Sequence, residues 1–360
     1  MKSYRAALIG CSRMGAFIDN EVQKDKNLAY SHAAGYESSP RTQLVALSDS
    51  RADVMAKAGE RYGVTADHQY KDYREMLVKE APDIVSVATQ PEHRAEIVLD
   101  TVNAGIPAIY AEKAMAASLS EAKDIVAACQ TNNVFFNLGT NRRWDSRWER
   151  AKEEIYSGQL GTLTTIISHW TGTLFNSASH MLDLMLWLHD DQPVEWLQGF
   201  LREPEDGLFD KETLTQDPVG EGIFRFSDGV YGYALNSTQG VNFELVCSEG
   251  SVVCREARGL WEIEHYAPST NSNAIKRTAM DVVEKSSTQA IIEDLVRALD
   301  TGNPPRGGVQ SAYQSTELIF AFIESHLGAG KRICLPLRNS TVRLTRNQQP
   351  RQPKYQPGFK

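Results

Sequence analysis

The chain has 360 residues, of which 41% are hydrophobic, so it is long enough for about two domains with apolar cores and too apolar for a disordered protein. Its 46 acidic and 38 basic side chains give a formal net charge of −8, which excludes a general electrostatic affinity for nucleic acid or an anionic membrane. No apolar run approaches the ~18 residues that span a bilayer, and the N-terminal segment lacks the pattern of a signal peptide, so we expect a cytoplasmic protein.

The chain has five scattered cysteines: Cys11, Cys129, Cys247, Cys254 and Cys334. Their number is odd, and none of them forms a Cys-x-x-Cys motif with another. We therefore expect reduced, mostly buried thiols and neither a disulfide framework nor a thiolate metal site. His169, His189 and Asp183 have no recognised metal-ligand spacing, so no metal is predicted.

Short runs rich in Val, Ile and Ala alternate with helix-like stretches in the first 140 residues, a pattern typical of a parallel sheet that is covered on both faces. Strands are predicted near 6–10, 43–49, 83–89, 107–112 and 134–139, and helices near 51–62, 92–104 and 118–131. Gly63, Gly105 and the pair Asn132-Asn133 stand where these helices should end. The fold class is therefore α/β, with an N-terminal Rossmann dinucleotide-binding domain over 1–140.

The rest of the chain has longer alternating strands with hairpin signals at 227–229 and 248–250, which predict a mostly antiparallel sheet. Helices predicted to frame this sheet lie near 146–157, 176–189, 288–301 and 309–328. We expect a C-terminal α+β domain with an open-faced sheet over 141–338. Residues 339–360 contain five basic residues, three prolines and no acid, which predicts an extended arm that either wraps a neighbouring subunit or is disordered.

A glycine-containing turn follows the first strand and opens a helix, with the sequence Gly10-Cys11-Ser12-Arg13-Met14-Gly15. Gly10 would allow the tight turn, Gly15 would allow close packing of the helix, and the backbone N–H groups at Ser12, Arg13 and Met14 would face a pyrophosphate. Ser12 replaces the usual middle glycine, so its side chain must point away from the phosphates or donate to them. An ordinary glycine-rich turn is the alternative.

The second strand ends in Asp49, whose carboxylate could accept hydrogen bonds from both hydroxyls of an adenosine ribose and would repel a 2′-phosphate. NAD is therefore favoured over NADP. Arg51 could stack on adenine or attract a phosphate instead. The gap between the turn and Asp49 is longer than usual and indicates an insertion at 19–31. Asp49 could also be the N-cap of the next helix.

Three further segments follow in order: Thr89-Gln90-Pro91-Glu92-His93, Ala111-Glu112-Lys113, and Asn176-Ser177-Ala178-Ser179-His180-Met181-Leu182-Asp183. Together they resemble the Gfo/Idh/MocA family of NAD(P)-dependent oxidoreductases, over residues 1 to about 337. The resemblance implies a Rossmann domain, an open-faced sheet used for oligomer contacts in a homodimer or homotetramer, and hydride transfer on sugars or polyols. It also implies a cofactor site that includes Thr89, Gln90, Pro91, His93, Glu112 and Lys113.

The sequence departs from that family at two places. Ala114 follows Lys113 where the family commonly has proline, which removes a constraint on the backbone. Asn176 stands where the family commonly has Asp, four residues before His180, and an amide can bind a hydroxyl but cannot accept its proton.

Lys113 follows a parallel strand at the edge where open α/β sheets bind ligands, so it could hold a reacting oxygen or, if it lost its charge, act as a base; a solvated surface lysine is the alternative. Asn176, His180, Asp183 and Trp187 have the spacing of one helix face. This stripe predicts a ligand contact, although Asn176 could be only an N-cap and His180 a core histidine. In the first helical turn, His180 would be held neutral by the helix dipole, as a base requires.

Arg142 and Arg143 follow the last strand of the first domain and could bind a substrate carboxylate or vicinal diol; a solvated basic turn is the alternative. The segment Tyr30-Ser31-His32 could reach over the cofactor or simply start a helix.

The sequence therefore predicts an NAD-dependent dehydrogenase that oxidises a secondary hydroxyl of a small carbohydrate, polyol or sugar acid. His180 is expected to be the base, with Lys113 and Asn176 positioning the oxygen and with Arg142, Arg143 and Asp183 near the substrate. The alternatives are a redox-neutral isomerase or glycoside-cleaving enzyme of the same fold, and a non-catalytic NAD-binding sensor.

Overall fold

The computed structural model describes residues 2–22, 28–202, 207–256, 259–265, 276–280, 283, 285–346 and 351–356. The chain forms two compact units that are interleaved in sequence. The first unit consists of Met1–Trp144, Lys285–Tyr313 and Asn347–Lys360, and the second of Asp145–Glu284 and Gln314–Arg346. The expected insertion at 19–31 and the arm at 339–360 lie partly outside the described residues, at 23–27, 347–350 and 357–360.

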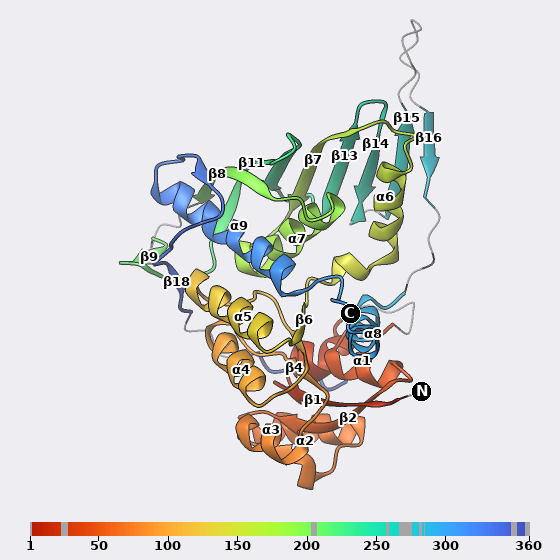
Figure 1. Ribbon diagram of the computed structural model, residues 1–360, viewed down its shortest axis with the longest axis vertical. Coiled ribbons are helices and arrows are strands. Elements are labelled where there is room, and N and C mark those ends of the chain that lie inside the picture. Colours follow the sequence, from red (N-terminus) through yellow and green to blue (C-terminus); the bar gives the residue numbers. More distant parts are fainter. Residues whose placement is uncertain are drawn as a thin grey trace, which may run out of the picture. The chain divides into compact units, whose positions relative to one another are not determined.

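The first unit contains the expected parallel sheet, with strand order β3-β2-β1-β4-β5-β6 (Figure 1). Its strands are β1 (Tyr4–Ile9), β2 (Thr42–Ser48), β3 (Gln69–Tyr70), β4 (Ile84–Val87), β5 (Ala108–Ala111) and β6 (Phe135–Leu138). Every residue of β4 and β5 is buried, as their mostly apolar composition predicts. The strand order reverses at β1, so β1 and β4 end at the point where such sheets bind ligands.

Some helices of the first unit begin at side-chain caps or end at a residue with a left-handed backbone. Ser31, Asp72 and Ser118 each accept a hydrogen bond from the first turn of the helix that follows, and Gly63 ends another with φ 71°. The helices are η1 (Arg13–Phe17), η2 (Ile18–Asn20), α1 (His32–Ser38), α2 (Ala52–Tyr62), η3 (Ala66–His68), α3 (Tyr73–Glu80), α4 (Pro91–Asn103), α5 (Leu119–Thr131) and η4 (Asn141–Trp144). The strand β3 and the helix α3 were not predicted. A strand of two residues, such as β3, is too short to show a hydrophobic period.

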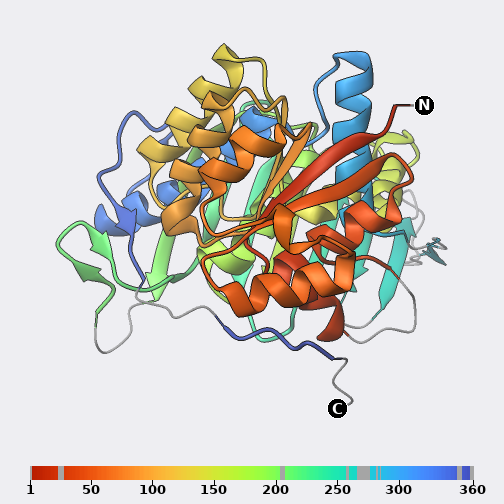
Figure 2. The same ribbon diagram turned by 90° about the horizontal axis from the view of Figure 1, so that it is seen from below.

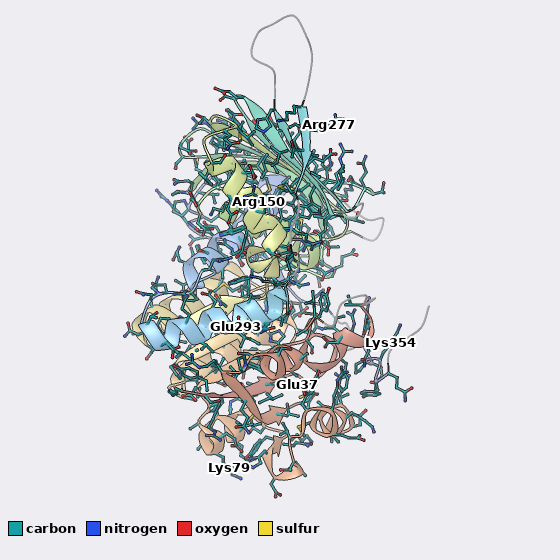
Figure 3. All side chains as sticks on the ribbon, turned by 90° about the vertical axis from the view of Figure 1, so that its right-hand side faces the viewer. Glu37, Lys79, Arg150, Arg277, Glu293 and Lys354 are labelled. Carbon is teal, nitrogen blue, oxygen red and sulfur yellow. The ribbon has the colours of Figure 1, made fainter. Side chains whose placement is uncertain are left out.

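Helix α8 (Ser287–Thr301) belongs to the first unit, which corrects the expectation that it frames the second sheet. Its apolar stripe, which includes Ile291 and Leu295, packs in one core cluster with Tyr4, Ile84 and Tyr110. Exposed Glu293 marks the outer face of the helix (Figure 3). An amphipathic pattern identifies the buried face of a helix but not the sheet that buries it.

The second unit contains a nine-stranded sheet of order β16-β15-β14-β13-β7-β12-β11-β8-β17. All its pairings are antiparallel except β7 with β12, and the predicted turns join β11 to β12 and β13 to β14. The strands are β7 (Leu163–Trp170), β8 (Val194–Arg202), β11 (Val219–Phe226), β12 (Tyr231–Asn236), β13 (Asn242–Cys247), β14 (Gly250–Arg255), β15 (Leu260–His265), β16 (Lys276–Ala279) and β17 (Ile333–Cys334). A small second sheet contains β9 (Phe209–Asp210), β10 (Thr213–Leu214) and β18 (Arg343–Leu344).

The remaining helices are α6 (Ser146–Tyr156), η5 (Leu174–Ala178), α7 (Ser179–Leu188) and α9 (Val309–Leu327).

The two faces of the large sheet differ. Phe322 of α9 packs so closely on β8 and β11 that a Cβ on Gly199 or Gly222 would overlap its ring. Outward-facing Phe200 and Tyr233 are 53% and 38% exposed, so this part of the sheet has an open apolar face.

The cysteines are free thiols, four of them buried and Cys334 exposed. None of the helices in the described ranges is long and apolar enough to cross a bilayer.

Candidate active site

The glycine turn has the backbone that its sequence predicts. Gly10 has φ 92°, and a Cβ there would lie 2.7 Å from the carbonyl oxygen of Ala88. A Cβ on Gly15 would overlap the carbonyl oxygen of Gly10. Both positions therefore require glycine, because the first helical turn lies against the ends of β1 and β4.

Ser12, in the middle of the turn, donates its hydroxyl to the carbonyl oxygen of Arg351 at 3.3 Å. The hydroxyl is thus bonded to the far end of the chain. Its carbonyl accepts from the N–H of Ala16 at 2.8 Å, which starts the helical turn η1. The first N–H groups of a helix have no partner within it and can face an anion.

Asp49 links the end of β2 to the glycine turn. Its carboxylate accepts from the N–H of Cys11 at 2.8 Å and from the N–H of Arg51 at 2.9 Å, and its side chain is 8% exposed. Arg51, not Asp49, is the N-cap of α2, so the N-cap interpretation of Asp49 is wrong. Asp49 fixes the turn and places a carboxylate beside it.

Glu112, at the end of β5, is held by a buried hydrogen-bond chain. His32 Nε2 lies 3.1 Å from Glu112 Oε1, His32 Nδ1 lies 2.9 Å from the Ser86 hydroxyl, and that hydroxyl lies 2.8 Å from the Tyr36 hydroxyl. The His32 ring also stacks on Tyr110, with centroids 3.9 Å apart. A carboxylate can only accept, so His32 Nε2 donates to Glu112.

The charge of Glu112 is stabilised despite its burial. Burial alone raises the pKa of Glu112, but the His32 hydrogen bond and the nearby charges of Lys113 and Arg94 outweigh it and hold that pKa below its ordinary value. His32 begins α1 after the cap Ser31, so the interpretation of this segment as a helix start is confirmed. The contact of His32 with Glu112 was not predicted.

Arg94 connects the two loops that contain the family motifs. It is 1% exposed and donates to the carbonyl oxygens of Thr89 and Ala114, which lie after β4 and after Lys113. Gln90 is the N-cap of α4 and Pro91 its first residue. The peptide bond from Lys113 to Ala114 is cis. His93, an expected cofactor residue, is exposed.

Lys113 is half-buried, so the interpretation as a freely solvated lysine is wrong. It follows Glu112, whose N–H bonds to the carbonyl oxygen of Val87 at 2.9 Å. A Cβ on Gly139 would lie 2.9 Å from Glu112 Oε1, so the end of β6 also approaches this point closely. The glycine turn, Asp49, the Thr89 loop and Lys113 thus follow the carboxyl ends of β1, β2, β4 and β5, at one edge of the sheet.

Asn176 and His180 lie in the second unit, on a helix that changes type between them. Asn176 is exposed in the π-helical turn η5, and half-buried His180 is in the first turn of α7. Ala178, the N-cap of α7, is itself helical with φ −65° and ψ −28°, so the two helices are continuous. The prediction of one regular helix face and the N-cap interpretation of Asn176 are therefore wrong. Asp183 is on α7 and 1% exposed.

The N-terminus of η5 is capped by Asp217, a residue that the sequence did not reveal. Its carboxylate accepts from the Thr173 hydroxyl at 2.6 Å and from the N–H groups of Phe175 and Asn176 at 2.9 and 3.0 Å. Burial raises the pKa of Asp217, although these hydrogen bonds act in the opposite direction. Because η5 continues into α7, the positive end of this helix lies at Asp217 and not at His180.

Arg142 and Arg143 form the 3-10 turn η4 in the first unit. Arg143 is fully buried and its carbonyl oxygen accepts from Arg306 at 2.6 Å, so it is not part of a solvated basic turn. Arg142 is half-buried.

Within the described ranges, no group of three or more His, Cys, Asp or Glu side chains is placed to hold a metal ion.

A parallel sheet with this turn after its first strand, an acid at the end of its second and a lysine at the end of its fifth defines a dinucleotide-binding domain of the Rossmann class. Residues 4–140 match the oxidoreductase family described as having an NAD-binding Rossmann fold. Over these residues the first unit is similar to the Gfo/Idh/MocA family of oxidoreductases.

The relatives with named activities include two dehydrogenases of different substrates. D-apiose dehydrogenase of Paraburkholderia graminis is 30% identical over 179 residues, which are 49% of this chain. Myo-inositol 2-dehydrogenase of Thermotoga maritima is 22% identical over 272 residues, which are 71% of this chain and 76% of that protein. The chain matches only 42% of the length of the apiose enzyme.

The similarity to solved structures covers residues of both units. The structure of levoglucosan dehydrogenase in complex with NADH and levoglucosan superposes with a TM-score of 0.74 at 17% identity, over 93% of this chain and all of that one.

Proposed function

We propose that the chain is an NAD-dependent dehydrogenase that oxidises a secondary hydroxyl of a sugar, polyol or sugar acid. The observation that carries this proposal is Lys113. It is half-buried beside a buried carboxylate, at the sheet edge that also contains the glycine turn. The activities of the apiose and inositol relatives, both oxidations of polyhydroxylated compounds, support the substrate class.

The residues at this edge fit a dinucleotide. Gly10 and Gly15 leave room for the turn, and the backbone at Ser12, Arg13 and Met14 would face the pyrophosphate. Asp49 would accept from the adenosine ribose and disfavours the 2′-phosphate of NADP, with Arg51 beside it. When bound, NAD⁺ supplies the acceptor for a hydride from the hydroxyl-bearing carbon.

The chain itself must hold the oxygen and take the proton. As the carbon loses its hydride, the hydroxyl proton passes to His180, and Lys113 stabilises the oxygen as it becomes a carbonyl. Asn176 donates from its amide to the same oxygen and cannot titrate. A neutral histidine is the better base near pH 7, because Lys113 would need a pKa about three units below ~10.4. His180 then returns the proton to solvent.

A panel of sugars, polyols and aldonic acids with NAD⁺ or NADP⁺, followed at the nicotinamide absorbance band, tests the proposal. We expect net NADH release with at least one class of substrate and none from the Lys113→Met variant. Substrate conversion without net NADH would instead support the redox-neutral alternative. Tight NADH binding without any conversion would support the sensor.

A further inference from the structure

Part of the expected arm at 339–360, residues 351–356, is packed on the chain itself. Residues 351–356 pack on the first unit alongside its first helical turns (Figure 2). The carbonyl oxygen of Arg351 accepts from the Ser12 hydroxyl at 3.3 Å, and that of Lys354 accepts from the Asn20 side-chain amide at 2.6 Å. We call residues 351–356 the C-terminal strap.

The strap is seated by two of its side chains. Pro353 is buried and Tyr355 half-buried, whereas the other strap residues are exposed. The Tyr355 ring meets the edge of Phe17, with centroids 5.0 Å apart, and packs on the core cluster that contains Cys11. Gln352 donates to the Tyr355 hydroxyl at 3.0 Å. This alternation of inward and outward side chains indicates a specific contact and not an accidental one.

The strap crosses the turn that is expected to hold the cofactor. Ser12 is the middle residue of that turn, and its hydroxyl is taken by the strap. Burial is the main cause that raises the pKa of Tyr355, and the charges of Asp53, Arg51 and Asp49 act on it as well; the last two residues are those assigned to the adenosine ribose. The strap therefore lies beside both the pyrophosphate and the ribose positions of the proposed site.

We propose that the C-terminal strap is the outer wall of the dinucleotide site, so that strap docking and cofactor binding strengthen each other. This proposal rests on the proposed function. The strap bonds to the side chains of Ser12 and Asn20, and among its described contacts none uses the backbone N–H groups of the turn. It therefore covers the turn without taking the donors that a pyrophosphate needs.

The C-terminal strap is positively charged, which favours binding of an anionic cofactor beside it. Exposed Arg351 and Lys354 are its charged side chains, and both charges help to lower the pKa of Glu21, after the larger effect of Arg13. A pyrophosphate at the turn would bring two negative charges near the strap, because the carbonyl oxygen of Arg351 is bonded to Ser12. Two cations nearby attract it, and the attraction should weaken as salt is added.

The test measures NADH binding by fluorescence titration without substrate, in the full chain and in a chain that stops after Arg346. We expect the shortened chain to bind NADH about 5- to 30-fold more weakly, since it loses the strap and the basic side chains of Arg351, Lys354 and Lys360. Equal or tighter binding would overturn the proposal, and tighter binding would identify the strap as an inhibitor. If the full chain itself binds no dinucleotide, the proposed function fails as well, so the two failures are distinguishable.

Point variants separate the effect of the strap's charge on NADH binding from a general effect of charge reversal on the protein. Lys354→Glu should weaken NADH binding about 3- to 10-fold at low salt and less at high salt. The matched control is Lys79→Glu, another exposed lysine of the first unit, well separated from Lys354 (Figure 3). The control should bind as the parent does. Equal losses in both variants would refute a local role of the strap.

Proteolysis provides a readout of the strap itself. Trypsin can cleave after exposed Arg351 and Lys354, and by reciprocal linkage NAD⁺ should slow cleavage at these two bonds by the same factor as the strap tightens NAD⁺. Faster cleavage in the presence of NAD⁺ would mean that the cofactor displaces the strap, and the proposal would be wrong.

Discussion

Replacing His32 by alanine should destabilise the first unit strongly. The change removes a hydrogen bond to a buried carboxylate, worth about 1.5–3 kcal/mol, one to the Ser86 hydroxyl, worth about 1 kcal/mol, and the stacking on Tyr110. Buried space is also left behind. We expect a loss of about 4 kcal/mol and, at about 2–4 °C for each kcal/mol, a melting temperature lower by about 10 °C.

The loss of stability caused by His32→Ala should depend on pH, and its direction follows from the pKa of Glu112. In the parent, the low pKa of Glu112 stabilises the fold above its unfolded pKa, and this contribution is lost as pH falls through the folded value. Without His32 the burial effect dominates and raises the pKa of Glu112, so the buried charge destabilises the fold as pH rises through that value. The His32→Ala chain should therefore lose more stability at pH 8 than at pH 5.

Thermal unfolding by circular dichroism at both pH values measures these effects. Tyr36→Phe is the matched control, because it removes only the hydroxyl that bonds to Ser86 and should lower stability by about 1 kcal/mol. Adding Glu112→Gln to His32→Ala should recover part of the loss at pH 8. The reasoning is refuted if His32→Ala melts within 2 °C of Tyr36→Phe, or if its loss is the same at both pH values.

Three other outcomes follow from the site and the open sheet face. His180→Ala should lower turnover by about 10² to 10⁴-fold with nearly unchanged NAD⁺ affinity, whereas Lys113→Ala should reduce both turnover and substrate affinity; the reverse pattern in steady-state kinetics would make Lys113 the base. NADP⁺ should bind at least about 10²-fold more weakly than NAD⁺ in calorimetric titrations, and Asp49→Asn should narrow this difference about tenfold; equal affinities in the parent would contradict the role of the carboxylate. Light scattering at micromolar concentration should give the mass of a homo-oligomer, and Phe200→Glu with Tyr233→Glu should shift it toward the monomer; a monomeric parent would exclude the oligomer.

The part of the site that the sequence predicted is the part made by neighbouring residues. Gly10 and Gly15 could be assigned because a six-residue turn imposes its own backbone conformation. Lys113 could be placed because open α/β sheets bind their ligands at the carboxyl ends of the parallel strands. In both cases the required geometry is local or follows from the class of sheet.

The remaining contacts join residues that are distant in sequence. His32 and Glu112 are 80 positions apart, and Ser12 and Arg351 are 339 apart. Hydrophobic periodicity does not report such pairs, because it describes one element at a time. The change from π-helix to α-helix between η5 and α7 was missed for another reason: a π-helical turn shifts the register of a helix without changing its apolar composition.

The interleaving of the two units has a consequence for how the chain can be made and divided. The core beside Tyr4 and Ile84 is closed by Ile291 and Leu295, which a ribosome adds after the whole of Asp145–Glu284. During synthesis the first unit therefore exposes an apolar surface until α8 has been made. A shortened protein that ends at Trp144 would keep all six strands of the parallel sheet and still lack this part of its core.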